Sequence, residues 1–177
     1  FDGHTGRHVS FGSALARSLA AKSITRFLIP VDATERGQQL RFFQEYFLVA
    51  CSLADLIRRF RRGNSHWSAL PEKAAIQLND THPALAVPEL MRILLDDGHL
   101  GWDEAWDLTQ RTLAYTNHTL LPEALEKWPL EWFQILLPRH LEIVFEINRR
   151  LLEAVSRRFP GDDGRLARTS LIEEGPA

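Results

Sequence analysis

Two short stretches of the sequence concentrate side chains that ionise or form hydrogen bonds. Residues 79–83 read NDTHP after the apolar run AAIQL, and residues 116–119 read TNHT after LAY. A turn between a strand and a helix needs one polar cap for its free N–H groups. An acid, an amide, a hydroxyl and an imidazole exceed that need. Asp80, His82 and His118 are therefore the candidate site residues.

The chemistry open to these residues depends on where the two stretches lie. Ligands of open α/β sheets bind in the crevice beyond the carboxyl ends of the strands. If the two preceding strands are parallel neighbours, Asp80, His82 and His118 face one such crevice. Three alternatives stay open: Asp80 or Thr81 caps a turn, the histidines are satisfied core residues, or the three side chains bind a metal ion. No familiar zinc spacing completes a metal site.

Hydrophobic periodicity predicts many helices and few strands to position these stretches. The expected helices cover 11–28, 38–62, 88–97, 102–114 and 138–159, with two short helical pieces on either side of Pro129, and the expected strands cover 74–78 and 114–118. Pro88 is expected to be the first residue of its helix, and Gly98 to stop it. The fold class predicted from this order is helix-rich α/β, with short parallel strands and long amphipathic helices.

Composition limits the class of protein. The 177 residues are 45% hydrophobic, which is enough for a core. A net charge of -2, from 21 basic and 23 acidic residues, argues against a nucleic-acid partner. No run reaches the roughly 18 apolar residues of a membrane helix.

Cys51 is the one cysteine, so a reducing, cytoplasmic location is expected, and its apolar surroundings predict a buried thiol. The chain begins at Phe1 without an initiator methionine, which suggests a piece of a longer polypeptide.

Two other features allow a functional or a structural interpretation. The tryptophans at positions 102, 106, 128 and 132 suggest sugar stacking, but their helical spacing favours packing. Four arginines at 58–62 suggest an anion site, although a solvated helix end is favoured because the arginines suit the negative end of the helix dipole.

Long motifs around the polar stretches resemble one family. Three motifs are similar to sequences of the α-glucan phosphorylases, which act on glycogen, starch and maltodextrin. They read QLNDTHPALAVPELMRILLDDG, WDEAWDLTQRTLAYTNHTLLPEALEKWP and LLPRHLEIVFEINRRLLEAV. The resemblance extends from about residue 24 to residue 174. It implies that residues 1–177 are a single segment of the family's N-terminal domain, which is part of a Rossmann-like domain of the GT-B type. The C-terminal cofactor-binding domain is expected to be absent.

The resemblance also implies an activity for the parent enzyme. Members of the α-glucan phosphorylase family use phosphate to release glucose 1-phosphate from α-1,4-glucans. They bind pyridoxal phosphate through a lysine, and the sequence motif of that lysine is absent here. The segment is therefore expected to form one wall of the active-site cleft, to be inactive alone, and to have the glucan, phosphate and the remaining chain as partners. Self-association is expected where its apolar surface is uncovered. Alternatives are a stand-alone carbohydrate-binding or interaction module, or a metal hydrolase that uses the three site residues.

Site residues follow from the resemblance by position. His118 resembles the histidine that binds the 6-hydroxyl of the glucosyl unit, and Asp80 and His82 resemble the pair beside its anomeric carbon. Glu123 lies in a loop that flanks the substrate path. Asp32 keeps the acid of a gate loop in which Ala33 stands where the family commonly has an asparagine. None of these residues is expected to transfer protons directly.

Overall fold

The computed structural model describes residues 22, 24, 34–121 and 125–173. The chain divides into two compact units, residues 1–47 and 48–177. Most of the predicted helix at 11–28 lies outside the described residues, and so do the site residues Asp32 and Glu123.

Helix α2 (Glu35–Gly63) confirms the long helix predicted for 38–62. It begins at a threonine cap, because the Thr34 hydroxyl accepts the N–H of Gly37 at 3.1 Å. Val49, Leu53 and Phe60 of α2 are buried. Cys51 is exposed, which corrects the expectation of a buried thiol. It is two residues from Val49 and from Leu53, and residues two apart on a helix point in different directions.

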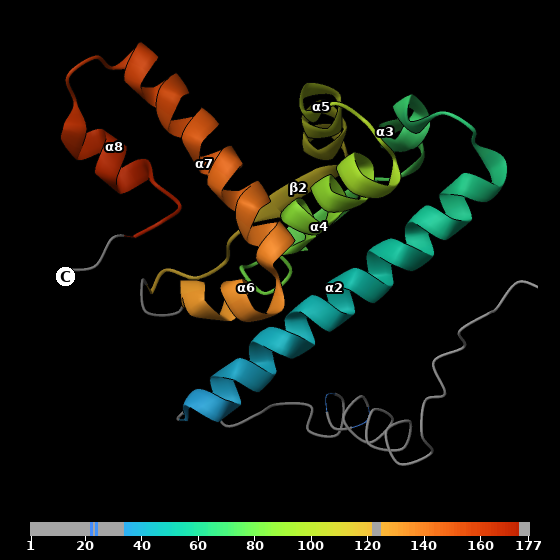
Figure 1. The fold of residues 1–177 in the computed structure, drawn as a ribbon, viewed down its shortest axis with the longest axis horizontal. Coiled ribbons are helices and arrows are strands. Elements are labelled where there is room, and N and C mark those ends of the chain that lie inside the picture. Colours follow the sequence, from blue (N-terminus) through green and yellow to red (C-terminus); the bar gives the residue numbers. More distant parts are fainter. Residues whose placement is uncertain (1–21, 23, 25–33, 122–124, 174–177) are drawn as a thin grey trace, which may run out of the picture. The chain divides into compact units, whose positions relative to one another are not determined.

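Two short strands form a parallel sheet (Figure 1). Strand β1 (Ile76–Asn79) pairs with β2 (Leu113–Thr116), so that the last residue of β1 lies opposite the last residue of β2. Both strands were predicted within two residues of their observed ends. Because the strands are parallel, their carboxyl ends lie side by side at the same end of the sheet. This brings the two polar stretches together.

The helix after β1 begins earlier than the sequence suggested. Helix α4 covers Ala86–Arg92 and continues as a π-helical turn, η2 (Ile93–Asp97). Pro88 is thus the third helical residue rather than the first. It is tolerated because the carbonyl of Ala84, which a residue at 88 would normally bond, already accepts the N–H of Val87 at 3.1 Å.

Gly98 ends this helix as predicted, but through close packing. Its N–H donates to the carbonyl of Ile93 at 2.8 Å, which closes the π turn. A Cβ at position 98 would lie 2.6 Å from the carbonyl oxygen of Leu94 and 3.0 Å from Nε1 of Trp67. The left-handed residue is the next one, His99, with a φ of 54°.

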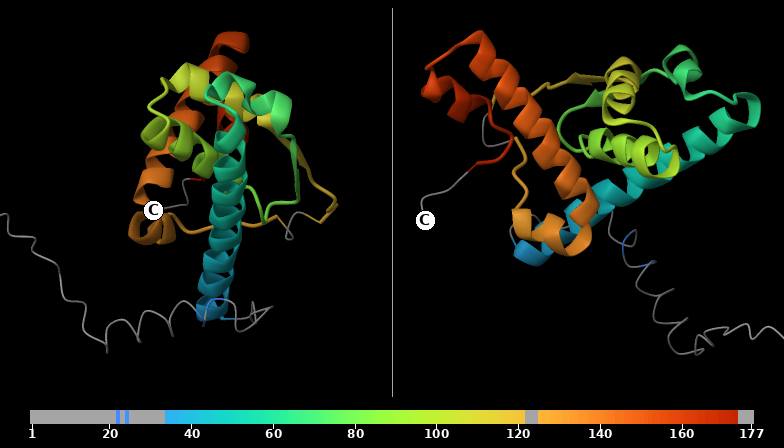
Figure 2. Two further views of the ribbon diagram at one scale, coloured as in Figure 1. Left: turned by 90° about the vertical axis from the view of Figure 1, so that its right-hand side faces the viewer. Right: turned by 45° about the horizontal axis from the view of Figure 1, so that its top comes forward.

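The remaining helices are η1 (Trp67–Ala69), α3 (Leu70–Lys73), α5 (Trp102–Thr112), α6 (Leu130–Leu136), α7 (Pro138–Arg158) and α8 (Asp163–Thr169). They pack in a chain of neighbours, with α3 on α5, and α6 and α8 on α7. Helix α4 packs on α5 and α7, and α8 folds back along α7 (Figure 2). The most deeply buried side chains include Leu85, Leu90, Met91, Leu94 and Ile143. The predicted fold class, helix-rich α/β with short parallel strands, is confirmed.

Three further features of the helices are the segment before Pro129, the buried face of α7 and the acidic end of η2. The helical piece expected before Pro129 does not form in the residues of this stretch that the structure describes, 119–121 and 125–128. The buried residues of α7 are His140, Leu141, Ile143 and Asn148. Asp96 and Asp97, unfavourably placed for the helix dipole, are bound by arginines.

Those arginines come from two helices. Arg139 of α7 donates two hydrogen bonds to Asp96, at 2.8 Å and 3.0 Å, and Arg92 of α4 donates one to Asp97 at 3.3 Å. The opposite charges offset the repulsion between the two carboxylates and the negative helix end.

Among the residues that the structure describes, no helix combines the length and the apolar character that crossing a bilayer requires.

Candidate functional site at the strand ends

Asp80 joins the carboxyl ends of the two strands. Its N–H donates to the carbonyl of Thr116 at 2.8 Å, which extends the ladder one residue past β1. Its φ of 64° is left-handed, a conformation that aspartate adopts more readily than most residues. The turn aims the Asp80 carboxylate at the chain that leaves β2. There Oδ1 accepts the main-chain N–H of His118 at 2.7 Å and lies 3.3 Å from Nδ1 of its ring.

This contact determines the charge and the tautomer at the site. Hydrogen bonding from the His118 N–H lowers the pKa of Asp80, burial opposes the shift, and the His118 ring and His82 add to the lowering. Asp80 is therefore ionised at neutral pH and can only accept hydrogen bonds. A neutral His118 ring that binds Asp80 must carry its proton on Nδ1, which leaves Nε2 as an acceptor. The His118 side chain is 61% exposed, so Nε2 is open to a ligand.

The loop after β2 is ordered by its own side chains. Oδ1 of Asn117 accepts the N–H of Thr119 at 2.8 Å, while its Nδ2 donates to the Tyr115 hydroxyl at 2.9 Å. The hydroxyl of Thr119 in turn accepts the N–H of Leu121 at 3.2 Å. His118 therefore lies in a short segment in which side chains bind the main-chain N–H groups.

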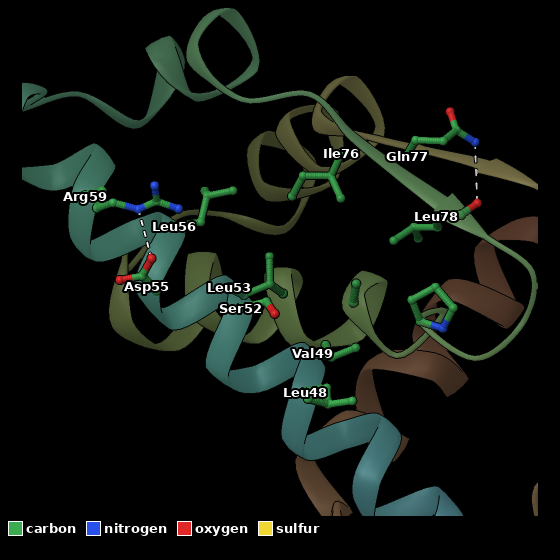
Figure 3. Close-up of a pocket in the computed structure, with 12 residues that line it drawn as sticks. Leu48, Val49, Ser52, Leu53, Asp55, Leu56, Arg59, Ile76, Gln77 and Leu78 are labelled. Carbon is green, nitrogen blue, oxygen red and sulfur yellow. Dashed lines mark hydrogen bonds and ion pairs between the residues drawn. The ribbon is translucent and has the colours of Figure 1, made fainter. Parts of the chain in front are cut away.

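The two faces of the sheet differ in character. Gln77 and Thr116 lie on one face, where the Gln77 amide donates to the Thr116 hydroxyl at 2.9 Å. Ile76 and Leu78 point the other way, toward α2, as Figure 3 shows. Between that face and α2 lies a cavity of about 490 Å³. Its lining is mostly apolar: Leu48, Val49, Ser52, Leu53, Asp55, Leu56, Arg59, Ile76, Gln77, Leu78, Pro83 and Ala86. Asp80, His82 and His118 do not line this cavity.

His82 does not join the pair. Its Nε2 lies 3.6 Å from Oε1 of Glu126, an acid that the sequence analysis did not single out. The His82 side chain is half exposed, so neither His82 nor His118 is a core histidine in the described part of the chain. Asp80, His82 and His118 do not bring three ligand atoms within metal-binding distance of one another. Asp80 does not cap α4, whose N-cap is Leu85, but as the capping alternative expects, its carboxylate satisfies a main-chain N–H, that of His118.

A second charged cluster was also missed, although it is more buried. Glu89 of α4 and His140 of α7 are 3% and 4% exposed, and the Glu89 carboxylate lies 2.5 Å from Nε2 of His140. Arg92 donates to the same carboxylate at 2.9 Å. Burial raises the pKa of Glu89, but hydrogen bonds from His140 and Arg92 outweigh it and leave the pKa below its usual range. The only signal in the sequence was an acid and a histidine within apolar helix patterns.

The structural interpretations of the arginines and tryptophans fit the contacts. Arg58 and Arg59 both pair with Asp55 at the exposed end of α2. Trp132 is buried, and the ring of Trp128 packs against Phe133 with centroids 6.1 Å apart.

The whole chain, residues 1–177, matches the family model described as carbohydrate phosphorylase. The chain belongs to this family. It is 54% identical over 171 residues to the muscle form of glycogen phosphorylase from Homo sapiens, and 53% identical to the muscle form from Oryctolagus cuniculus and the brain form from Bos taurus. These matches cover 92% of this chain and 20% of each relative. The chain therefore spans about a fifth of the length of these phosphorylases, and the resemblance seen in its motifs is confirmed.

Proposed function

We propose that this chain forms one wall of the glucan-binding cleft of a phosphorylase that releases glucose 1-phosphate from α-1,4-glucans. The observation that carries the proposal is the joined pair Asp80 and His118, at the carboxyl ends of neighbouring parallel strands. That edge is where α/β sheets bind their ligands. The family membership and the glycogen phosphorylase relatives give the substrate class.

Each residue of the site has a distinct part in the proposal. Nε2 of His118 accepts a hydrogen bond from the 6-hydroxyl of the terminal glucosyl unit, and the main-chain carbonyl of His118 faces the anomeric side. The ionised Asp80 and the nearby His82 line the pocket beside the anomeric carbon. There they order water, and the negative charge favours the positive charge that develops on an oxocarbenium-like transition state. Asp32 and Glu123, which lie outside the described residues, complete the proposed set.

The family's pyridoxal phosphate does not fit the described part of this chain. The lysines of the sequence are Lys22, Lys73 and Lys127. Lys127 donates to Glu173 at 2.8 Å, Lys73 ends the short helix α3, and neither lines the cavity beside the sheet. Cofactor and phosphate are therefore assigned to other parts of the parent polypeptide. Residues 1–177 are then a single segment of its N-terminal domain, in a cytoplasmic enzyme.

The test is phosphorolysis of maltodextrin by the full-length polypeptide. His118→Ala removes the proposed contact with the 6-hydroxyl, and kcat/KM should fall about tenfold or more, because a hydroxyl of the transition state loses its partner. His66→Ala, an exposed loop histidine with no side-chain cap bond, is the matched control and should behave as wild type. Wild-type kinetics for His118→Ala would contradict the proposal. This chain alone, supplied with phosphate and pyridoxal phosphate, should form no glucose 1-phosphate.

A stand-alone carbohydrate-binding module is the second candidate. One observation favours it: the contact between Asp80 and His118 is formed entirely within this chain. Calorimetric titration of the chain with maltoheptaose distinguishes the two. Binding that His118→Ala weakens would support a module, whereas absence of binding would leave the wall of a larger cleft as the function.

A further inference from the structure

Two side chains fix successive N–H groups at His118. The Asp80 carboxylate accepts the N–H of His118 itself, at 2.7 Å, and Oδ1 of Asn117 accepts the N–H of Thr119, at 2.8 Å. These N–H groups lie before and after the Cα of His118. The direction in which the imidazole leaves the main chain is therefore set from both sides.

The Asn117 amide also bonds a third residue. The Thr119 N–H can only donate, so it fixes the oxygen end of the amide on its own side and leaves the NH₂ end free to donate elsewhere. Nδ2 donates to the hydroxyl of Tyr115, on β2, at 2.9 Å. Asn117 is half-buried, whereas Tyr115 and His118 are exposed. The amide thus connects the end of the strand to the loop that carries the imidazole.

We propose that Asn117 is a positioning residue that holds His118 ready for the sugar hydroxyl, an inference that rests on the proposed function. Without Asn117, the main chain at 118 and 119 gains freedom that sugar binding must remove again, and that ordering costs free energy. The loss of binding free energy acts through His118, so it should appear only with sugars that carry a hydroxyl on carbon 6. Loss of stability alone would affect all substrates equally.

The experiment compares two donors in the synthetic direction, with the full-length polypeptide and a maltooligosaccharide primer. Glucose 1-phosphate carries the 6-hydroxyl and 6-deoxyglucose 1-phosphate lacks it. The measured quantity is the ratio of their kcat/KM values. His118→Ala should lower this ratio about tenfold, and Asn117→Ala should lower it about fivefold. In a His118→Ala background, Asn117→Ala should change the ratio no further.

Two matched variants separate positioning from folding. Asn117→Asp keeps an oxygen that accepts the Thr119 N–H and should retain most of the ratio. Tyr115→Phe removes only the partner of Nδ2 and should lower the ratio less than Asn117→Ala does. A wild-type ratio in Asn117→Ala, beside a lowered ratio in His118→Ala, would overturn the inference.

Hydrogen exchange of residues 115–121 provides a readout that needs no activity. Asn117→Ala should speed the exchange of the main-chain N–H of Thr119 about fivefold or more, because that N–H loses its acceptor, while the N–H of His118 keeps the Asp80 carboxylate. Exchange that stays as slow as in wild type would overturn the positioning role. If His118→Ala leaves the donor ratio unchanged, the proposed function fails on its own, and the exchange rates still decide whether Asn117 orders His118.

Discussion

The carboxylate of Asp80 accepts the main-chain N–H of His118 at 2.7 Å, although the two residues are 38 positions apart in the sequence. The parallel register explains the contact. Asn79 lies opposite Thr116, so the residues that follow each strand leave the same edge of the sheet. A single left-handed residue then turns its carboxylate across to the neighbouring strand.

Asp80 has a conformational role that substitutions can separate from its hydrogen bond. Asp80→Ala loses the bond and puts at a φ of 64° a residue that tolerates this conformation less well than aspartate, so it should lower the free energy of unfolding of the chain most. Asp80→Gly loses the bond but adopts this φ without strain, so it should lower the free energy of unfolding less than Asp80→Ala does. Asp80→Asn keeps an acceptor and tolerates this φ, so it should cost least. Urea denaturation measures the three values, and equal losses in all three would contradict this account.

The buried carboxylate of Glu89 should matter far more for stability than an exposed one. Glu89→Gln leaves the His140 and Arg92 side chains beside a neutral group, and we expect a loss of about 3 kcal/mol. Glu142→Gln is the matched control, because its ion pair with Arg139 is on the surface and should contribute no more than about 1 kcal/mol. Urea denaturation of both variants gives the comparison. Similar losses in the two would show that the buried cluster has no special weight.

Stability should also depend on pH through Glu89. Its folded-state pKa is lowered below the ordinary value of 4.5, because His140 and Arg92 outweigh the effect of burial. A carboxyl group with a lowered pKa stabilises the fold above its unfolded pKa, and this contribution is lost as pH falls through the folded value. The difference in free energy of unfolding between wild type and Glu89→Gln should therefore shrink as the pH falls below the ordinary value of 4.5. A difference that grows on acidification would have the wrong sign.

Self-association of the isolated chain is expected from its exposed apolar side chains. Leu120 is 96% exposed and Ile135 is 69% exposed. Apolar surface of this kind promotes association between copies. Sedimentation velocity should show species larger than a monomer at about 50 µM, and Ile135→Lys should reduce them by placing a charge on α6. A monodisperse wild-type monomer at that concentration would contradict this prediction.

Local patterns predicted the elements well and their tertiary partners poorly. The apolar spacing in α2 and the short apolar runs of β1 and β2 depend on neighbouring residues, so the sequence alone was sufficient. The pairing of Glu89 with His140 joins residues 51 positions apart and has no local signature.

For the site residues too, the strand ends that position them could be predicted, but their long-range partners could not. Parallel pairing of two predicted strands was enough to expect Asp80 near His118. The partner of His82 was not predictable, because Glu126 lies in a loop whose path depends on long-range contacts. The start of α4 was predicted two residues too late, at Pro88. The hydrogen bond between Val87 and Ala84 that accommodates the proline cannot be predicted from the hydrophobic pattern.

The central claim is that a glucan contacts both strand ends, and hydrogen exchange tests it most directly. Exchange is measured on the full-length polypeptide with and without maltopentaose and phosphate. The account predicts slower exchange in residues 76–82 and 114–121 on addition of the oligosaccharide, with no change in helix α5 as the internal control. Unchanged exchange at both strand ends, at saturating oligosaccharide, would contradict it.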